Sequence, residues 1–465
     1  MTEVDDGTAE IGNADFLLDL PIEASDHILC YLSESDLCYM ACCSRRWREM
    51  TNTDTLWKHR CKLRGWERYG TTVDLNPDHA FVDQPFTDIT TADCETLVPT
   101  SKWKATFYKA SKVERNWAEF RCLKETYMYP LGGHHWIHGR KDSSAYHCDG
   151  YFVVQCSSDG IHLQNLLYRA STPSEYKNGA ILKCPEKHCS NVKTILLSKG
   201  IGLIVSDERD WDMVRTFDCR AARWLASFRC DCKSNLLLCL DGETVIGRCG
   251  KDDDGRCIRV WSSTEGTQQH MLQGHSREIQ DLALSGDLAV SAAENLRLWD
   301  VNKGQCLRIF QCPAGVGGFT SCKIDPGHLL GGYDRTAMLS DLKSGSCITI
   351  SECKPDEVKF NACLIACPMD GVAKVWSHAG NLLGTESGEM LHGLAGPRLA
   401  LGHRDNWLDI RHVQGGRIQP LVNVVDVLHR TLSWKVIWMD DTKLVYLDRN
   451  DSHDMYEYIS VFYFW

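Results

Sequence analysis

The stretch DFLLDLPIEASDHILCYLSESDLCYMACCSRRWREM, residues 15–50, decides how the fold of this chain begins. It opens with Asp19 and Pro21, and a carboxylate that caps free N–H groups beside a proline with a preset φ is typical of a helix start. Ala24, Ile28 and Leu32 then recur at every fourth residue. That spacing predicts a helix with one apolar face.

More short helices are predicted behind the first. Residues 37–44 repeat the helical apolar spacing after Ser33, and Asp54 is expected to cap a last helix that holds Leu56 and Trp57. A bundle of about fifty residues is near the lower size limit for a self-sufficient core. Part of its apolar surface is therefore predicted to await a partner.

The same residues resemble the F-box in both order and spacing. The segments that carry the resemblance are Leu20-Pro21-Ile22-Glu23, Ile28-Leu29, Tyr31-Leu32, Ser35-Asp36-Leu37, Cys42-Cys43-Ser44-Arg45-Arg46-Trp47 and Leu56-Trp57-Lys58. The resemblance implies docking on the small adaptor subunit of cullin-based ubiquitin ligases. The residues it implies for adaptor binding are Leu20, Pro21, Ile28, Leu29, Leu32 and Leu37. The alternative is a helical cap for the rest of the chain.

Composition sets limits on the function. The 465 residues leave room for two or three domains, or for one small domain and a large repeat array. A net charge of −11 gives no reason to expect nucleic acid, which demands clustered cations. Residues 1–14 read as a flexible acidic tail rather than a signal peptide, and no apolar run is long enough to cross a membrane. The expected location is the cytoplasm, with the nucleus as a second compartment.

The 24 cysteines are mostly scattered singly through apolar runs, which favours buried free thiols over disulfides. A zinc site needs paired ligands at short spacing twice over, and only half of that pattern is present. The residues concerned are Cys184, His188, Cys189, Cys230 and Cys232. Three loop histidines, His134, His135 and His138, are expected to be solvated. No metal, cofactor or catalytic residue is predicted.

Residues 66–113 are predicted to form a linker. Its middle, 71–100, carries many Asp and Thr residues with little periodicity and is expected to be an irregular excursion. A short helix around Trp103 and Phe107 follows, ending near Ser111, and its aromatic residues are expected to pack on the helical module.

The remainder of the chain repeats. Short alternating strands end in Trp, Ser or Asp, and a glycine turn follows each of them; they are Ile258-Arg259-Val260-Trp261, Leu296-Arg297-Leu298-Trp299-Asp300, Ala337-Met338-Leu339-Ser340-Asp341 and Ala373-Lys374-Val375-Trp376. Gly274-His275 precedes Trp299 at the interval expected of a repeat of about 40 to 45 residues.

These repeats resemble the WD-repeat β-propeller. In that family a histidine, a turn aspartate, a serine and a tryptophan form a hydrogen-bonded stack, and His275, Ser291 and Trp299 match three of the places. Glu294 and Asn295 stand where the aspartate belongs, so a looser turn is expected. The stack is interpreted as structural rather than as a catalytic triad, because no activated nucleophile recurs.

Degenerate copies extend the array in both directions, and we expect eight blades. Seven is the alternative if the interval from Trp376 to Asp409 is not a full blade. A ring needs an early strand to complete its last sheet, and 117–123 is the candidate for it. The predicted domains are the tail 1–14, the helical F-box 15–65, the linker 66–113 and the propeller 114–465.

The whole chain thus resembles an F-box/WD-repeat protein, with an α module followed by an all-β propeller. The resemblance implies a non-catalytic substrate receptor that joins an adaptor and a cullin scaffold to a protein substrate of unknown identity. A WD-repeat scaffold outside any ligase is the alternative. Gln280, Tyr333, Arg335 and Met369 are the predicted substrate-binding residues at one rim of the propeller. Only Arg335 is basic, and the run 251–254 is acidic, which disfavours a phosphorylated ligand.

Overall fold

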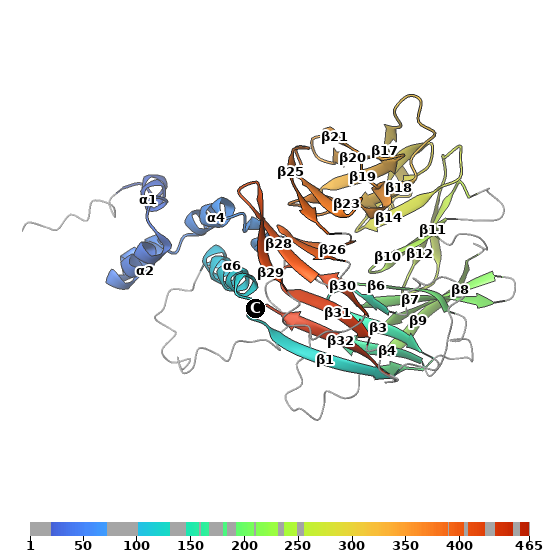
Figure 1. The fold of residues 1–465 in the computed structure, drawn as a ribbon, viewed down its shortest axis with the longest axis horizontal. Helices are drawn as coiled ribbons and strands as arrows, with labels where there is room; N and C mark the ends of the chain where they lie inside the picture. The colour runs from blue at the N-terminus through green and yellow to red at the C-terminus, as the bar shows by residue number, and fades with distance from the viewer. Residues whose placement is uncertain are drawn as a thin grey trace, which may run out of the picture. The chain divides into compact units, whose positions relative to one another are not determined.

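A computed structural model describes 13 segments of the chain, and the chain divides into two compact units between Asn116 and Trp117 (Figure 1). The described residues are 20–71, 101–130, 146–157, 160–166, 180–183, 192–208, 211–230, 237–248, 255–388, 390–403, 408–423, 433–449 and 456–464. The predicted tail and most of the predicted excursion lie outside them.

Short helices build the first unit, as the apolar spacing predicts. Their bounds are α1 (Ile22–Leu29), α2 (Glu34–Cys43), α3 (Arg45–Met50), α4 (Asp54–Leu63), the 3₁₀ turn η2 (Glu67–Gly70) and α6 (Lys102–Ala118). Ser33 caps α2 in a reciprocal capping box with Asp36, and Ser44 caps α3. The predicted cap residue Asp19 lies outside the described residues.

The prediction that Asp54 caps α4 is wrong. Thr53 occupies the N-cap position, and Asp54 is the first residue of the helix. The Asp54 carboxylate instead accepts a hydrogen bond of 2.8 Å from the backbone N–H of Trp103, in the first turn of α6. An unpaired N–H group at a helix start is a good donor to a carboxylate, so Asp54 caps the neighbouring helix rather than its own.

Helix α6 runs to Ala118, so the prediction that it ends near Ser111 is also wrong. Trp103 and Phe107 join the core of the unit with Leu29, Leu37 and Trp57, which confirms the expected packing of these aromatic residues on the helical module. Ala110 and Val113 continue the same buried face, and this continuing apolar spacing explains the extra length.

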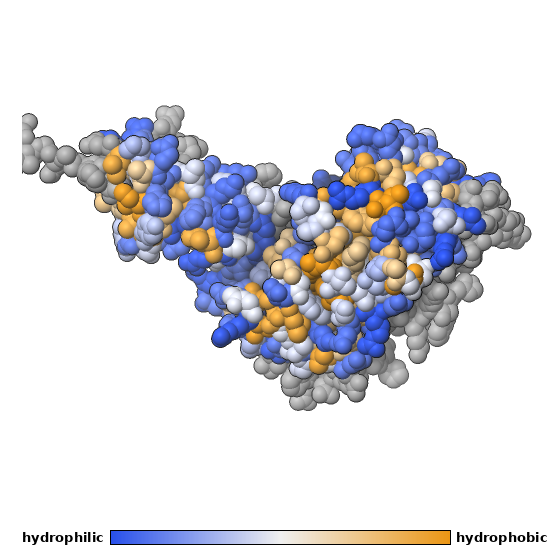
Figure 2. Space-filling view, turned by 90° about the horizontal axis from the view of Figure 1, so that it is seen from above, coloured by the Kyte–Doolittle hydropathy of each residue, from blue (hydrophilic) through white to orange (hydrophobic). Residues whose placement is uncertain are grey.

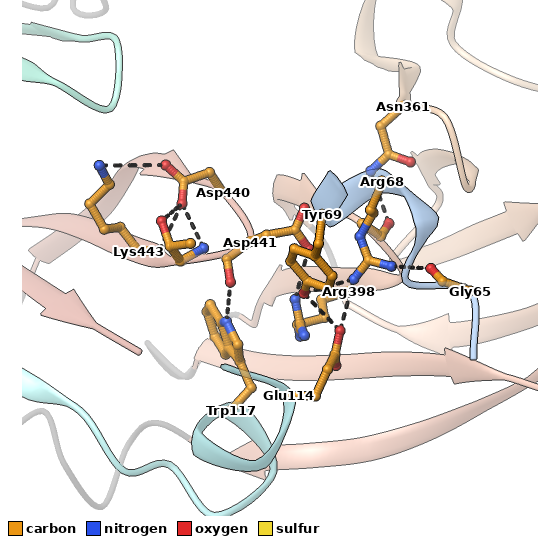
Figure 3. A network of polar contacts seen from close by, with 12 residues as sticks. Gly65, Arg68, Tyr69, Glu114, Trp117, Asn361, Arg398, Asp440, Asp441 and Lys443 are labelled. Carbon is orange, nitrogen blue, oxygen red and sulfur yellow. Dashed lines mark hydrogen bonds and ion pairs between the residues drawn. The ribbon is translucent and has the colours of Figure 1, made fainter. Parts of the chain in front are cut away.

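A carboxylate also ties η2 to α6. Glu114 Oε1 lies 2.8 Å from Arg68 Nη2 and accepts a hydrogen bond of 2.8 Å from the Tyr69 hydroxyl (Figure 3). Both side chains of the ion pair are largely shielded from water, at 11% and 17% exposure. The pair is therefore screened less than a surface ion pair would be.

Eight antiparallel sheets of four strands each form the second unit, which confirms eight blades and rules out seven. Blades 1 to 4 contain β2 (Tyr146–Cys148), β3 (Phe152–Ser157), β4 (Gly160–Asn165), β5 (Ala180–Leu182); β6 (Val192–Ser198), β7 (Ile201–Glu208), β8 (Trp211–Asp218), β9 (Arg223–Cys230); β10 (Leu238–Asp241), β11 (Thr244–Arg248), β12 (Ile258–Ser262), β13 (Gln268–Leu272); β14 (Asp281–Ser285), β15 (Leu288–Ala292), β16 (Asn295–Asp300) and β17 (Gln305–Gln311).

Blades 5 to 8 continue the same order. They contain β18 (Ser321–Ile324), β19 (His328–Tyr333), β20 (Thr336–Asp341), β21 (Cys347–Ser351); β22 (Lys359–Phe360), β23 (Ile365–Met369), β24 (Val372–Trp376), β25 (Leu382–Ser387); β26 (Met390–Ala395), β27 (Arg398–Gly402), β28 (Leu408–Gln414), β29 (Arg417–Asn423); β30 (Ser433–Met439), β31 (Lys443–Arg449), β32 (Tyr456–Tyr463) and β1 (Leu123–Pro130). A 3₁₀ turn, η6 (Pro355–Glu357), precedes blade 6.

An early strand closes the ring, as predicted, but not at 117–123. Strand β1 begins at Leu123 and pairs with β32 in antiparallel register, Leu123 opposite Tyr463. Trp117 lies in the last turns of α6 instead. The helical apolar spacing that starts at Trp103 includes Trp117, and this explains why the residue is helical rather than extended.

Trp117 nevertheless secures the closure. Its buried indole stacks on Phe464, with ring centroids 3.6 Å apart, and its Nε1–H donates to the Asp441 carbonyl at 2.7 Å (Figure 3). The buried Arg398 guanidinium lies over the same ring at 5.0 Å and 3.1 Å from the Asp441 carboxylate. Trp117, which precedes β1, and Phe464, which follows β32, thereby pack together at blade 8.

The predicted hydrogen-bonded stack is present in blade 4. Ser291 Oγ lies 2.6 Å from His275 Nε2 and accepts a hydrogen bond of 2.9 Å from Trp299 Nε1. The turn is held rather than loose, because the Glu294 carboxylate lies 3.2 Å from His275 Nδ1 and accepts the backbone N–H groups of Ser276 and Arg277. The longer glutamate side chain compensates for the missing aspartate.

We predict that Trp117→Ala lowers the free energy of unfolding of the propeller by about 3–5 kcal/mol, because it leaves a cavity against Phe464. Trp117→Phe keeps a six-membered ring in the stack but loses the bond to the Asp441 carbonyl and part of the buried ring, so its expected cost is smaller, about 1–2 kcal/mol. Chemical denaturation of the two variants measures both values. Equal losses would contradict the stacking argument.

Candidate partner-binding surfaces

A buried arginine organises the helical unit. The Arg60 residue is 6% exposed, and its guanidinium donates to the carbonyl oxygens of Leu29 and Leu32, at and just after the end of α1, and lies 3.4 Å from Glu34 Oε1 at the start of α2. A cation is favourable at a helix C-terminus and a carboxylate at a helix N-terminus, so one side chain of α4 satisfies both ends.

The Glu34 carboxylate receives two cations. Arg64 Nη2 lies 3.0 Å from the same oxygen, Glu34 Oε1, and is 53% exposed. Burial alone would raise the pKa of Glu34, but its own backbone N–H, Arg64 and Arg60 together lower that pKa. The carboxylate therefore stays ionised at neutral pH, and the junction of α1, α2 and α4 stays paired.

The six predicted adaptor-binding residues fall into two groups. Leu29 and Leu37 are completely buried in the core of the unit, where they shape the helices. Pro21 and Ile28 are exposed, and Leu20 and Leu32 are half-buried. The spacing of Ile28, Leu29 and Leu32 does not show which of them is buried. On so short a helix, neighbouring apolar residues lie at the boundary between the core and the surface.

Three exposed apolar residues were missed by the sequence analysis. Tyr31 is 80% exposed directly after α1, Tyr39 is 73% exposed on α2, and Leu63 is 71% exposed at the end of α4. Figure 2 shows hydrophobic residues gathered at the surface of the N-terminal helices. Only Tyr39 gave a signal in the sequence, because it lies off the apolar repeat of its helix, where a polar residue is expected.

The predicted substrate-binding residues of the propeller lie in turns at one end of neighbouring blades. Tyr333 and Arg335 border the turn between β19 and β20, and Met369 ends β23 in the next blade. Arg335 Nη2 lies 3.5 Å from Met369 Sδ, so the structure brings these two residues together. Gln280 precedes β14 in blade 4 and donates to the Glu278 carbonyl at 3.1 Å.

The cations at this end of blades 4 to 6 have different partners. Arg277 donates to the Gly317 carbonyl at 2.5 Å, whereas Lys374 is paired with a carboxylate, 3.2 Å from that of Glu352. Arg335 contacts a thioether, which does not neutralise its charge. Asp334 sits at the tip of its turn with φ of 47°, a left-handed conformation that aspartate tolerates better than most residues.

The structure describes only some of the cysteines and histidines that were considered as metal ligands. The histidines 134–138 and the cluster 184–189 lie outside the described residues, and Cys230 is a buried free thiol at the end of β9. All 19 cysteines in the described segments are free. Those segments contain no group of three or more His, Cys, Asp or Glu side chains placed to hold a metal ion. None of their helices could cross a membrane.

Comparison with known proteins identifies the first unit. The F-box-like family model matches residues 17–63. That match precedes an eight-bladed ring whose fourth blade carries a WD-type stack. An F-box-like domain followed by an eight-bladed propeller fits the architecture of an F-box/WD-repeat protein.

Individual relatives match this chain over short regions. The probable E3 ubiquitin ligase complex SCF subunit sconB of Aspergillus fumigatus is 28% identical over 165 residues, 23% of this chain and 24% of that protein. Autophagy-related protein 16 of Arabidopsis thaliana is 27% identical over 149 residues, 29% of this chain and 28% of that protein. The chain thus spans about a quarter of the length of these relatives. The solved structure of U3-55K covers 58% of this chain and 95% of its own at 11% identity, with a TM-score of 0.38.

We predict that Arg60→Ala lowers the free energy of unfolding of the helical unit by about 2–3 kcal/mol, because it removes a buried guanidinium that donates to the Leu29 and Leu32 carbonyls and pairs with Glu34. Arg64→Ala is the matched control, since it removes an exposed contact to the same oxygen and should cost less than about 1 kcal/mol. Thermal unfolding of both variants tests this. A similar loss for the two would contradict the role of burial.

Proposed function

We propose that this protein is the substrate-recognition subunit of an SCF-type cullin ubiquitin ligase. In this proposal the F-box unit docks on the adaptor subunit, the adaptor joins the cullin scaffold, and the propeller binds the protein to be ubiquitinated. The observation that carries the proposal is the F-box-like match over residues 17–63, in one chain with an eight-bladed propeller. The relatives named as SCF subunits support it.

Exposed apolar side chains support the docking half of the proposal. Ile28, in the last turn of α1, is 38% exposed, and Tyr31, just after the helix, is 80% exposed. A self-sufficient cap would turn such residues inward, since exposed aromatic and aliphatic side chains on a small unit gain free energy when a partner covers them. Tyrosine is also among the residues that contribute most to protein interfaces.

The mechanism is proximity rather than catalysis by this chain. A receptor that holds the substrate and the ligase together converts a bimolecular encounter into an effectively intramolecular one. The residues proposed here make contacts and take no part in bond formation. Ubiquitin transfer itself belongs to other subunits of the ligase.

For the substrate we propose a protein segment that is basic or unmodified rather than phosphorylated. Phosphate is best gripped by arginines that hold it bidentately, usually several together. In the described turns of blades 5 and 6, Arg335 contacts Met369, while Asp334 and Asp370 stand at the turn tips. Tyr333 and Met369 are mostly buried beside them and offer only a small apolar surface. The acidic run 251–254, which disfavours a phosphorylated ligand on sequence grounds, lies outside the described residues.

We predict that Ile28→Ala with Tyr31→Ala weakens binding to the purified adaptor subunit at least tenfold, because two exposed apolar contacts of about 1–2 kcal/mol each are lost. The matched control is Ile309→Ala with Leu307→Ala on β17. These side chains are similarly exposed, at 43% and 51%, but lie in the propeller. Calorimetric titration of wild type and both variants measures the affinities.

Binding by the wild type and the control, with loss in the α1 variant, would support the receptor. Absence of adaptor binding by the folded wild-type chain would overturn the ligase proposal and leave a WD-repeat scaffold as the remaining function. Equal weakening in both variants would overturn the docking surface proposed here.

A further inference from the structure

Two histidines meet where blades 5 and 6 adjoin, at the end of the sheets opposite Tyr333 and Met369. His328 is the first residue of β19, and His378 lies in the turn after β24. Their rings are 4.3 Å apart between centroids, and His378 Nδ1 lies 3.2 Å from His328 Nε2. The two histidines belong to neither of the partner-binding surfaces described above. Their contacts have the same consequence whether or not the protein is part of a ligase.

Each histidine has a second partner in its own blade. His378 Nε2 lies 2.6 Å from the Asn361 carbonyl oxygen, after β22. His328 Nδ1 lies 3.3 Å from Asp325 Oδ1, in the turn between β18 and β19. The order of groups is therefore carboxylate, imidazole, imidazole and carbonyl, from blade 5 to blade 6.

The acceptors at the two ends decide where the hydrogens are. A carbonyl oxygen only accepts, so His378 Nε2 carries a hydrogen, and in the neutral ring Nδ1 is then an acceptor. His328 Nε2 must donate to that nitrogen. Asp325 also only accepts, so all contacts are satisfied when His328 carries hydrogens on both nitrogens and His378 on one.

Addition of a second proton to the histidine pair breaks this series of contacts. A fully neutral pair loses only the bond to Asp325 and keeps the bond between the rings. A doubly protonated pair has two N–H groups and two positive charges facing each other at 3.2 Å, which breaks the bond between the rings. We propose that His328 and His378 form an acid-sensitive latch between blades 5 and 6, closed with up to one proton and opened by the second.

The surrounding charges fit this order of events. Asp325 faces His328 from the β18–β19 turn, and Asp341, at the end of β20, lies 3.9 Å from His328 Nε2. Both carboxylates stabilise a positive charge on the His328 side of the pair. On the blade 6 side the group that faces His378 is the neutral Asn361 carbonyl. Burial lowers the pKa of His378 and the neighbouring His328 lowers it further, whereas the Asn361 contact, Asp325 and Asp341 act in the opposite direction without cancelling the shift.

The sign of the pH effect follows from the lowered pKa of His378. Between that value and the ordinary histidine value of 6.5, the unfolded chain binds more protons than the folded chain. The contribution of the latch to stability is therefore complete above the ordinary value and is lost as the pH falls through the lowered one.

The first test follows imidazole nitrogens by NMR in the full chain labelled with ¹⁵N-histidine, between pH 5 and 8. His328→Gln and His378→Gln assign the two rings. In the wild type we expect the midpoint of His378 to lie below the ordinary histidine value, and in His328→Gln we expect it to rise toward that value. Independent titration of the two rings, with midpoints unmoved by loss of the other, would overturn the latch.

The second test is thermal unfolding at pH 7.5 and 5.5. Glutamine at position 378 offers an acceptor and a donor but cannot be protonated, so His378→Gln should lose less melting temperature on acidification than the wild type. The matched control is His270→Gln, because His270 Nε2 also contacts a turn carbonyl of the next blade, Asn302 at 2.9 Å. The control should keep the wild-type pH dependence. Full pH dependence in His378→Gln would overturn the latch, and His378→Asn repeats the test if the glutamine variant does not fold.

Discussion

The pairing of β1 with β32 is the constraint on which the rest of the propeller depends. Seven blades are each built from consecutive strands, but the eighth takes its outer strand from the beginning of the unit. Without that strand, β32 would leave a row of backbone N–H and C=O groups unpaired. Trp117 and Phe464 lie just outside the two paired strands, and their stacking anchors the closure with side chains as well as backbone. Stability of the ring is thus tied to two segments that are more than 300 residues apart in the sequence.

The blades keep the apolar pattern of their strands more faithfully than the polar stack of the WD repeat. Blade 4 retains His275, Ser291 and Trp299 and substitutes Glu294 for the usual aspartate. Burial of alternating apolar residues supplies most of the stabilisation in a sheet packed on both sides, while one hydrogen-bonded stack adds a smaller and replaceable share. Degenerate blades are tolerated for this reason, and polar groups between blades are free to take other forms, such as the histidine pair of blades 5 and 6.

The helical unit has too few residues to build a large apolar core, unlike the propeller. It is small, and one buried arginine, Arg60, joins α1, α2 and α4 at the expense of desolvating a charge. Helix α6 adds Trp103 and Phe107 to the core, so the short bundle reaches stability with help from a distant part of the chain. The apolar residues that stay outside, among them Ile28 and Tyr31, are the surface on which the proposed adaptor contact rests.

The sequence by itself indicated the short helices of the first unit and the repeating strands of the second, because both depend on local spacing that burial enforces wherever the chain goes. The resemblance to WD repeats located the stack of His275, Ser291 and Trp299, and strand pairing in the tertiary structure decided for eight blades over seven. The sequence also located the propeller turn that carries Arg335. Only the tertiary structure decided that Leu29 and Leu37 are core while Tyr31 is surface, that Asp54 caps α6, and that Trp117 is helical. Each of these depends on which distant group lies opposite, such as the Trp103 amide or the Phe464 ring. Periodicity along a chain predicts which residues share a face, but contacts across the fold decide what that face meets.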